Sequence, residues 1–322
     1  MRDLLSRPWF EPVLTVLAIV ILLGGLFAYS GNWPPLVVVE SSSMQHGGHD
    51  VLGIINTGDL VLVKKVVVPS GVTTYVEGLV SGYTTYGEYG DVLLYFANGN
   101  TAYTPVIHRA MLWLDWNQTA QEFAAPSLAP LSDTCGLSSW DNYAIIPPGA
   151  PAGTFVCVSP SSPNTPFTGT LDLFNIGWQQ VNVSIDLTYL EKSSGHSGFI
   201  TEGDDNCNLS PEPCVHGETG TYDQSGCIIS CIVAPGWVEG VARGMIPWFG
   251  AIKLWLSGNG SDVPPETGEY LGLTILAILV LPTVVPRLVH HVRNRRQRPE
   301  RQEPEPSPED EPADASDGPS EE

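Results

Sequence analysis

Residues 12–30, PVLTVLAIVILLGGLFAYS, contain no charged side chain, and they determine on which side of a membrane the following residues lie. At 1.5 Å per residue, a helix of this length crosses a bilayer core of roughly 30 Å. Arg2 and Arg7 precede the run, and positive residues favour the cytoplasmic side. The sequence therefore predicts a transmembrane helix over 12–30 after a short cytoplasmic N-terminus, 1–11.

A second apolar run, YLGLTILAILVLPTVVP, occupies residues 270–286, contains Pro282 and is predicted to be a second transmembrane helix. The arginines that follow it are Arg287, Arg293, Arg295, Arg296 and Arg298. This basic cluster predicts that residues 287–322 are cytoplasmic, so that 31–269 lie outside the plasma membrane of a multi-pass protein. A cleaved signal peptide ending at Ala28-x-Ser30 is the alternative for the first run. The anchor is favoured because the run is longer than the core of a typical signal peptide.

The outer segment, 31–269, has the pattern of a mainly β domain. Its strand-like runs include DLVLVKKVVV (59–68), DVLLYFA (91–97), GTFVCVS (153–159) and VNVSIDLTYL (181–190), separated by turn residues. The formal net charge is −21, and part of it comes from the tail RQEPEPSPEDEPADASDGPSEE (301–322), which is predicted to be disordered. Binding of nucleic acid is excluded, because an acidic surface repels phosphates.

All six cysteines lie in the outer segment, which indicates an oxidising compartment and up to three disulfides. They are Cys135, Cys157, Cys207, Cys214, Cys227 and Cys231. Cys135 and Cys157 are expected to pair, because the other four cluster in one loop. The spacings C-x6-C and C-x3-C fit no common zinc module. His46 and His49 with Asp50 resemble a metal pair, but their glycine-rich loop favours a solvated or loop-packing role. No metal or cofactor is expected.

Five short segments of this domain carry residues suited to chemistry. They are Ser41–Ser43 with Met44 after LVVVE, the Gly58–Asp59 and Gly90–Asp91 turns, His108–Arg109 after an apolar strand, Gly203–Asp204–Asp205, and Asp223. Each segment alone is weak, since serine triplets and Gly-Asp pairs are ordinary turn chemistry. Their order in one domain, just outside a membrane anchor, is informative.

That order resembles type I signal peptidases, in particular the archaeal and endoplasmic-reticulum branch that uses histidine as the base. The resemblance implies a signal-peptidase-type β-barrel or sheet domain over 31–269, with an insertion at about 112–198. Against the family pattern, His46 replaces a proline, Glu202 replaces a basic residue and Asp205 replaces an asparagine.

The resemblance also implies a role for each matching residue. Ser43 would be the nucleophile and His108 the general base. Asp204 would orient His108 with support from Asp223, and the choice between Asp204, Asp205 and Asp223 stays open. The Ser43 N–H and the Ser41 hydroxyl would form the oxyanion hole. The residues expected to contact substrate are Met44, Asp91 and Arg109.

The implied function is signal peptidase I, a serine endopeptidase that removes signal peptides after small residues. Its expected partners are signal-peptide-bearing precursors, membrane lipid and the Sec-type translocation machinery. Two alternatives are a membrane-anchored, disulfide-stabilised adhesion or envelope domain without catalysis, and a dedicated processing protease for a few surface precursors.

Overall fold

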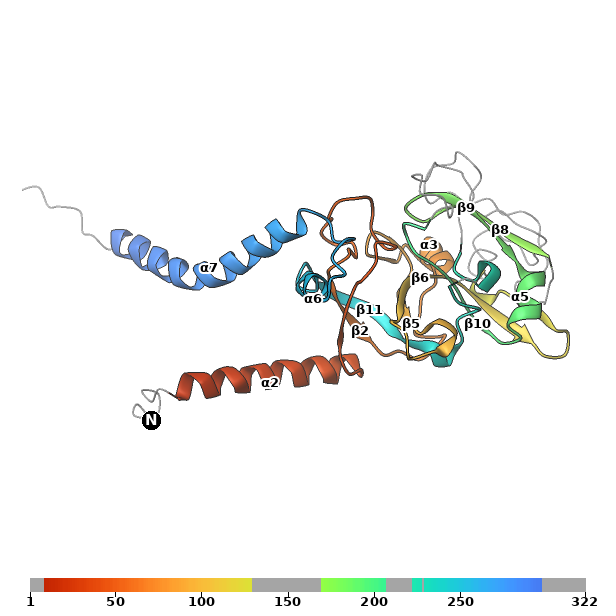
Figure 1. Ribbon diagram of the computed structural model, residues 1–322, viewed down its shortest axis with the longest axis horizontal. Helices are drawn as coiled ribbons and strands as arrows, with labels where there is room; N and C mark the ends of the chain where they lie inside the picture. The colour runs from red at the N-terminus through yellow and green to blue at the C-terminus, as the bar shows by residue number, and fades with distance from the viewer. Residues whose placement is uncertain (1–8, 129–168, 207–221, 228, 297–322) are drawn as a thin grey trace, which may run out of the picture. The chain divides into compact units, whose positions relative to one another are not determined.

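A computed structural model describes residues 9–128, 169–206, 222–227 and 229–296 of the chain (Figure 1). The chain divides into two compact units, residues 1–271 and 272–322. The first unit holds all the strands found in the described residues and is mainly antiparallel sheet, which confirms the predicted mainly β class. The expectations for residues 1–8 and for the acidic tail fall outside the described residues.

One large antiparallel sheet forms the centre of the first unit. In spatial order it contains β1 (Leu36–Val38), β2 (Leu60–Lys64), β11 (Val238–Ile246), β5 (Val92–Tyr95), β6 (Val106–Asn117) and β10 (Gly198–Glu202), and β7 (Glu122–Ala124) also pairs with β6. In the described part of the chain this sheet does not close into a barrel. The finer prediction of a signal-peptidase-type barrel is therefore not confirmed.

The strand β2 shows why these residues form a sheet. Its sequence LVLVK alternates between half-buried and buried positions, with Val61 and Val63 inside. Branched side chains at every second position pack well on a pleated surface. The turn before β2 requires glycine, because Gly58 has a φ of +96° and a Cβ there would lie 3.0 Å from the Cβ of Ala251.

Two smaller hairpins and several short helices surround the sheet. They are β3 (Thr84–Thr85) with β4 (Glu88–Tyr89), β8 (Thr170–Ile176) with β9 (Val181–Asp186), α3 (Tyr75–Ser81), α5 (Leu187–Ser193) and α6 (Ala251–Ser257). Single 3-10 turns cover Ala97–Gly99, Pro126–Leu128, Ser225–Cys227 and Pro235–Trp237.

The region expected to be an insertion is joined to the main core. Its predicted start at residue 112 falls inside β6, which continues to Asn117. Leu171 and Val183 of the β8–β9 hairpin are buried in the same apolar cluster as Leu112 and Leu114 of β6. The hairpin therefore shares its core with the strand that carries His108.

Among the residues that the structure describes, two helices are long and apolar enough to cross a membrane. They are α2 (Phe10–Ser30) and α7 (Thr267–Arg296), whose apolar segments have mean hydropathies of 2.4 and 1.9. The α7 helix begins in the first unit and continues into the second, through Pro282 and Pro286. Both lie where the sequence predicted spans, and their length and composition alone are weak evidence of association with a membrane.

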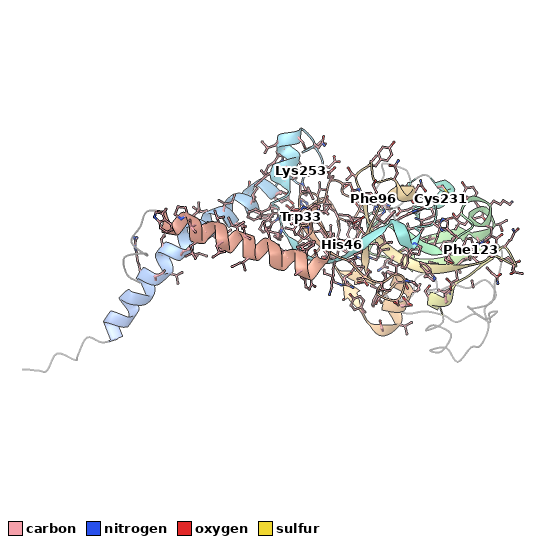
Figure 2. The ribbon with its side chains drawn as sticks, turned by 90° about the horizontal axis from the view of Figure 1, so that it is seen from below. Trp33, His46, Phe96, Phe123, Cys231 and Lys253 are labelled. Carbon is pink, nitrogen blue, oxygen red and sulfur yellow. A yellow bond between two sulfur atoms is a disulfide. The ribbon has the colours of Figure 1, made fainter. Side chains whose placement is uncertain are left out.

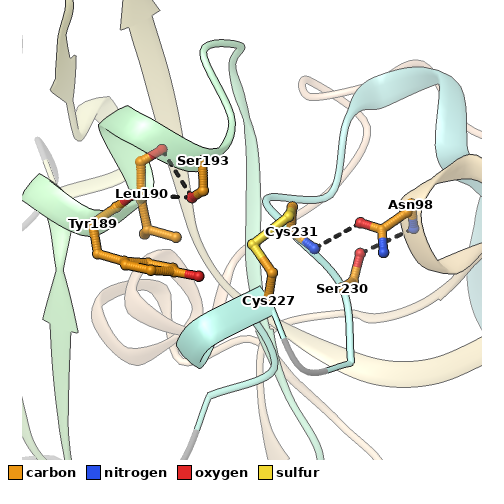
Figure 3. The surroundings of a disulfide bond; sticks show 7 residues. All are labelled: Asn98, Tyr189, Leu190, Ser193, Cys227, Ser230 and Cys231. Carbon is orange, nitrogen blue, oxygen red and sulfur yellow. Dashed lines mark hydrogen bonds between the residues drawn. A yellow bond between two sulfur atoms is a disulfide. The ribbon is translucent and has the colours of Figure 1, made fainter.

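A disulfide joins Cys227 to Cys231 (Figure 3). Asn98 holds the loop between them, because its N–H donates to Ser230 Oγ at 3.2 Å and its Oδ1 accepts from the Cys231 N–H at 2.8 Å. The loop is thus fixed to the end of β5 through the 3-10 turn at Ala97–Gly99. The remaining cysteines, including the predicted Cys135–Cys157 pair, lie outside the described residues.

Candidate active site

The structure brings Ser43 and His108 into hydrogen-bond contact, with 2.8 Å between Ser43 Oγ and His108 Nε2. Ser43 lies in the turn that follows β1, and His108 lies near the start of β6. The imidazole is 4% exposed and is therefore held by its surroundings. The contact joins a hydroxyl to a group able to accept its proton.

The carboxylate that contacts His108 belongs to Asp223. Its Oδ2 lies 2.5 Å from His108 Nδ1 and also accepts hydrogen bonds from Tyr95 at 2.9 Å and Thr201 at 2.7 Å. An ionised carboxylate only accepts, so Nδ1 carries the proton and Nε2 is free to accept from Ser43. The partners of Asp223 thus select the tautomer of His108 that a general base needs.

Asp204 does not contact His108, which corrects the assignment of Asp204 as the acid that orients it. It forms a two-point ion pair with Arg109, with Nε–Oδ1 at 2.7 Å and Nη2–Oδ2 at 2.6 Å. Burial by itself would raise the pKa of Asp204, but the Arg109 guanidinium outweighs it and holds that pKa below its usual range. The physical reason is the strand period of two, which directs His108 and Arg109 to opposite faces of β6.

Arg109 and Asp91, expected to bind substrate, are buried structural residues. Arg109 is 1% exposed, and its Nη1 donates to the carbonyls of Thr85, Glu88, Tyr89 and Gly90. Asp91 is also 1% exposed, and its carboxylate accepts from Arg243, Tyr83 and the Thr73 N–H. Neither lines the cleft described next, so their assignment to substrate contact is corrected.

A cleft of about 390 Å³ opens beside Ser43 and His108. Its walls are residues 38–41 with Ser43 and Met44 on one side, residues 104–108 on the other, and Asn206 and Ile229. Met44, the third residue expected to contact substrate, does line it, although its side chain is only 1% exposed. Ile229 reaches the cleft from the loop that the Cys227–Cys231 disulfide closes.

Ser41 and the main chain of Ser43 supply donors next to the Ser43 hydroxyl. Ser41 Oγ lies 3.3 Å from Ser43 Oγ, and both residues line the cleft. Among the described residues, no acceptor takes the Ser43 N–H. These two donors are available for an oxygen that gains negative charge beside Ser43 Oγ.

Glu202, directly before the Gly203–Asp204 turn, is 5% exposed, and its Oε2 has no hydrogen-bond partner among the described residues. Burial, together with the charges of Asp223 and Asp204, raises the pKa of Glu202 well above its usual range. Glu202 therefore stays protonated at a pH at which an exposed glutamate is ionised.

His46 and His49 bond to different acids and do not converge. His46 Nε2 lies 3.1 Å from Asp204 Oδ2, whereas His49 Nδ1 lies 2.9 Å from Glu266 Oε1. The next residue, Asp50, donates its N–H to Glu266 Oε1 at 3.1 Å and accepts through Oδ2 from Thr267 Oγ1. In the part of the chain that the structure covers, no three histidine, cysteine or acidic residues are grouped as metal ligands.

Tyr95 and Thr201 were missed by reasoning from the sequence. Both bond to Asp223 Oδ2, and Tyr95 Oη also lies 3.1 Å from Thr201 Oγ1. Tyr95 ends the apolar run DVLLY, where an aromatic residue indicates only core packing. Thr201 lies two residues before Gly203, and its nearness to the acidic turn was the one signal present.

Ser43, His108 and Asp223 together form a hydroxyl–imidazole–carboxylate chain at the edge of an open cleft. This arrangement can activate a serine hydroxyl for attack on a carbonyl carbon, and the nearby donors can stabilise the resulting oxyanion. No protein-family model matches the chain, nor does any curated protein or solved structure.

Proposed function

We propose that this chain is a membrane-anchored serine endopeptidase that removes signal peptides from exported precursors, as type I signal peptidases of the archaeal and endoplasmic-reticulum kind do. The observation that carries the proposal is the contact chain from Ser43 through His108 to buried Asp223. The order of motifs along the sequence supports the choice of substrate class.

In the proposed mechanism, Ser43 Oγ attacks the carbonyl carbon before the scissile bond while His108 Nε2 takes its proton. Asp223 stabilises the imidazolium through Nδ1–H, and the Ser43 N–H and Ser41 hydroxyl bind the oxyanion. His108 then gives the proton to the leaving amine as the C–N bond breaks. A water molecule, deprotonated by His108, releases the acyl group from Ser43.

The strand edges beside the cleft suit an extended substrate. In the described residues β1 pairs only with β2, and β10 pairs with β6 from Arg109 onward, which leaves the start of β6 unpaired on that side. A peptide added between these edges gains main-chain hydrogen bonds, and pockets along the cleft then choose its side chains. Small residues are expected before the cut, as the order of motifs along the sequence implies.

The position of Ser43 supports a substrate that emerges from a membrane. Only residues 31–42 separate it from the end of α2. The proposed topology has α2 and α7 as spans of the plasma membrane, with the arginines after α7 in the cytoplasm and the sheet domain outside. The cleavage site of a signal peptide held in the same bilayer is then near the height of Ser43.

The test uses the full chain in liposomes with a secretory precursor that carries alanine at the first and third positions before the cut. The expected result is one new N-terminus at that junction, identified by mass spectrometry. Replacing the first of these alanines by phenylalanine should prevent cleavage. The chain with Ser43→Ala is the matched control, since it keeps the spans and the cleft. Equal cleavage by both chains would show that the protease assignment is wrong.

Gly203 gives a second prediction. A Cβ at this position would lie 2.6 Å from Ser43 O and 2.9 Å from His108 Nε2. Gly203→Ala should therefore separate the hydroxyl from the imidazole, and a displacement of ~1 Å costs about 100-fold in turnover. Steady-state kinetics on the same precursor measures the loss.

The matched control for Gly203→Ala is Gly236→Ala, because a Cβ at Gly236 meets no atom within 4 Å. It should leave kcat unchanged. Equal activity of the two variants would contradict a close approach of Gly203 to the reacting groups.

A further inference from the structure

The turn of the β8–β9 hairpin, residues 177–180, contacts two loops. One, residues 43–46, contains Ser43, and the other, residues 203–206, packs against it. Trp178 stacks on His46, with ring centroids 4.9 Å apart and an angle of 9° between the planes. His46 follows Ser43 by three residues in the same loop. The indole is 37% exposed and thus covers the imidazole from the solvent side, leaving the His46 side chain 8% exposed.

His46 links the hairpin to the loop 203–206, which contains Asp204 and Asp205. Its Nε2 lies 3.1 Å from Oδ2 of Asp204, which is itself fixed by the two-point ion pair with Arg109. A charged pair buried in the core has little freedom to move, because each partner would lose its compensating charge. The stacked indole and this pair therefore hold His46 from two sides.

Gln179 makes a second, separate connection from the hairpin. Its Nε2 donates to Asp205 Oδ1 at 2.5 Å, and the Asp205 N–H donates to the carbonyl of Ser43 at 2.8 Å. Gln179 is thus connected to the main chain of Ser43 through a single residue, Asp205. Adjacent residues of one turn hold both the loop that contains Ser43 and the loop packed against it.

The strands of the hairpin are themselves fixed by burial in the core. Leu173, Val181 and Ile185 are each about 1% exposed or less and lie in the main core cluster. The Gly177 N–H donates to Tyr75 Oη of α3 at 3.1 Å. The turn is therefore fixed to the core at its root and touches the nucleophile loops at its tip.

We propose that Trp178 and Gln179 are positioning residues for Ser43, an inference that rests on the proposed protease function. Neither lines the cleft, so they act through His46 and Asp205 and not on the substrate. Their hold keeps the main chain of Ser43 at the distance from His108 that proton transfer needs. Loss of the hold should lower kcat and leave KM unchanged.

The experiment measures kcat and KM of the full chain in liposomes for Trp178→Ala, Gln179→Ala and Trp178→Phe. A loop displaced by ~1 Å loses about 100-fold in turnover, so Trp178→Ala should lose 10-fold to 100-fold in kcat. Trp178→Phe keeps an aromatic face over His46 and should recover most of the loss. A rise in KM at constant kcat, or no rescue by phenylalanine, would overturn the proposal.

The matched control is Trp116→Ala. Trp116 packs on Phe123 with the same centroid separation of 4.9 Å, and Phe123 lies well away from His46 along the domain (Figure 2). Trp116→Ala removes an aromatic contact and leaves the loops 43–46 and 203–206 unchanged. An equal fall in kcat for Trp116→Ala and Trp178→Ala would reduce the effect to general destabilisation and overturn the proposal.

Amide hydrogen exchange provides a readout that does not need activity. Trp178→Ala should speed exchange in residues 43–46 and 203–206 and leave β5 and β6 protected, because only the two loops lose their hold. Unchanged exchange in both loops would overturn the inference. If the wild-type chain cleaves no precursor, the proposed function fails, and the exchange comparison still decides whether the hairpin holds the Ser43 loop.

Discussion

Replacing Ser43 by alanine should lower kcat on a signal-peptide precursor by about six orders of magnitude, and His108→Ala should cost nearly as much. The two groups act as one unit, since the hydroxyl attacks only while Nε2 takes its proton. Single-turnover cleavage with excess enzyme gives a direct measure of this step. The rate that remains measures the acceleration contributed by substrate binding in the cleft and by the oxyanion donors.

Asp223→Asn should reduce kcat by about 10⁴-fold in the same assay. An amide at this position can donate to Nδ1, which favours the tautomer with the proton on Nε2 and prevents Nε2 from accepting the Ser43 proton. The comparison variant is Asp204→Asn, because Asp204 is also buried and does not contact His108. Asp204→Asn should lose much less turnover than Asp223→Asn, because Asp204 acts on the Ser43 loop only through its contact with His46. The reverse result would restore Asp204 as the orienting acid.

Arg109→Leu should lower the free energy of unfolding by about 3–5 kcal/mol, because it leaves the Asp204 carboxylate buried without its ion-pair partner. The four main-chain carbonyls that Nη1 bonds also lose their donor. For a domain of this size, each 1 kcal/mol shifts Tm by about 2–4 °C. A thermal unfolding scan of the detergent-solubilised chain should therefore show a fall of roughly 6–20 °C.

Two further variants sharpen this result. Arg243→Leu removes a guanidinium that also bonds a buried carboxylate, Asp91, but the Arg243 side chain is 25% exposed and water can replace part of its contact. It should cost less than Arg109→Leu. The double variant Arg109→Leu with Asp204→Leu should recover part of the lost stability, since no unpaired charge remains. An Arg109→Leu chain as stable as the wild type would contradict the structural role of the pair.

Much of the architecture followed from local patterns. The apolar runs predicted both long helices, and alternation in segments such as LVLVK predicted strands, because burial of every second side chain is a property of the strand itself. Whether the sheet closes into a barrel could not be predicted, since pairing between distant strands depends on contacts that no local pattern encodes. The contact of Trp178 with His46 is of the same long-range kind.

The orienting acid could not be chosen from the sequence. The strand period separates His108 from Arg109, but it does not say which face each acid approaches. Residues 203–222 separate β10 from Asp223, and a stretch of this length gives no indication of where the chain returns. The roles of Arg109 and Asp91 also could not be read from the sequence, because a charged residue beside a motif either contacts substrate or is paired inside the core. Here Arg109 pairs with Asp204 and Asp91 with Arg243.

The bonds from His49 and Asp50 to Glu266 and Thr267 have a practical consequence for protein engineering. A soluble fragment trimmed before residue 266 to remove α7 also removes the partners of both side chains. In such a fragment the loop that begins with Ser43 lacks the hydrogen bonds to Glu266 and Thr267. Fragments intended for crystallisation or inhibitor screening should therefore end after Thr267, with the helix shortened from its far end.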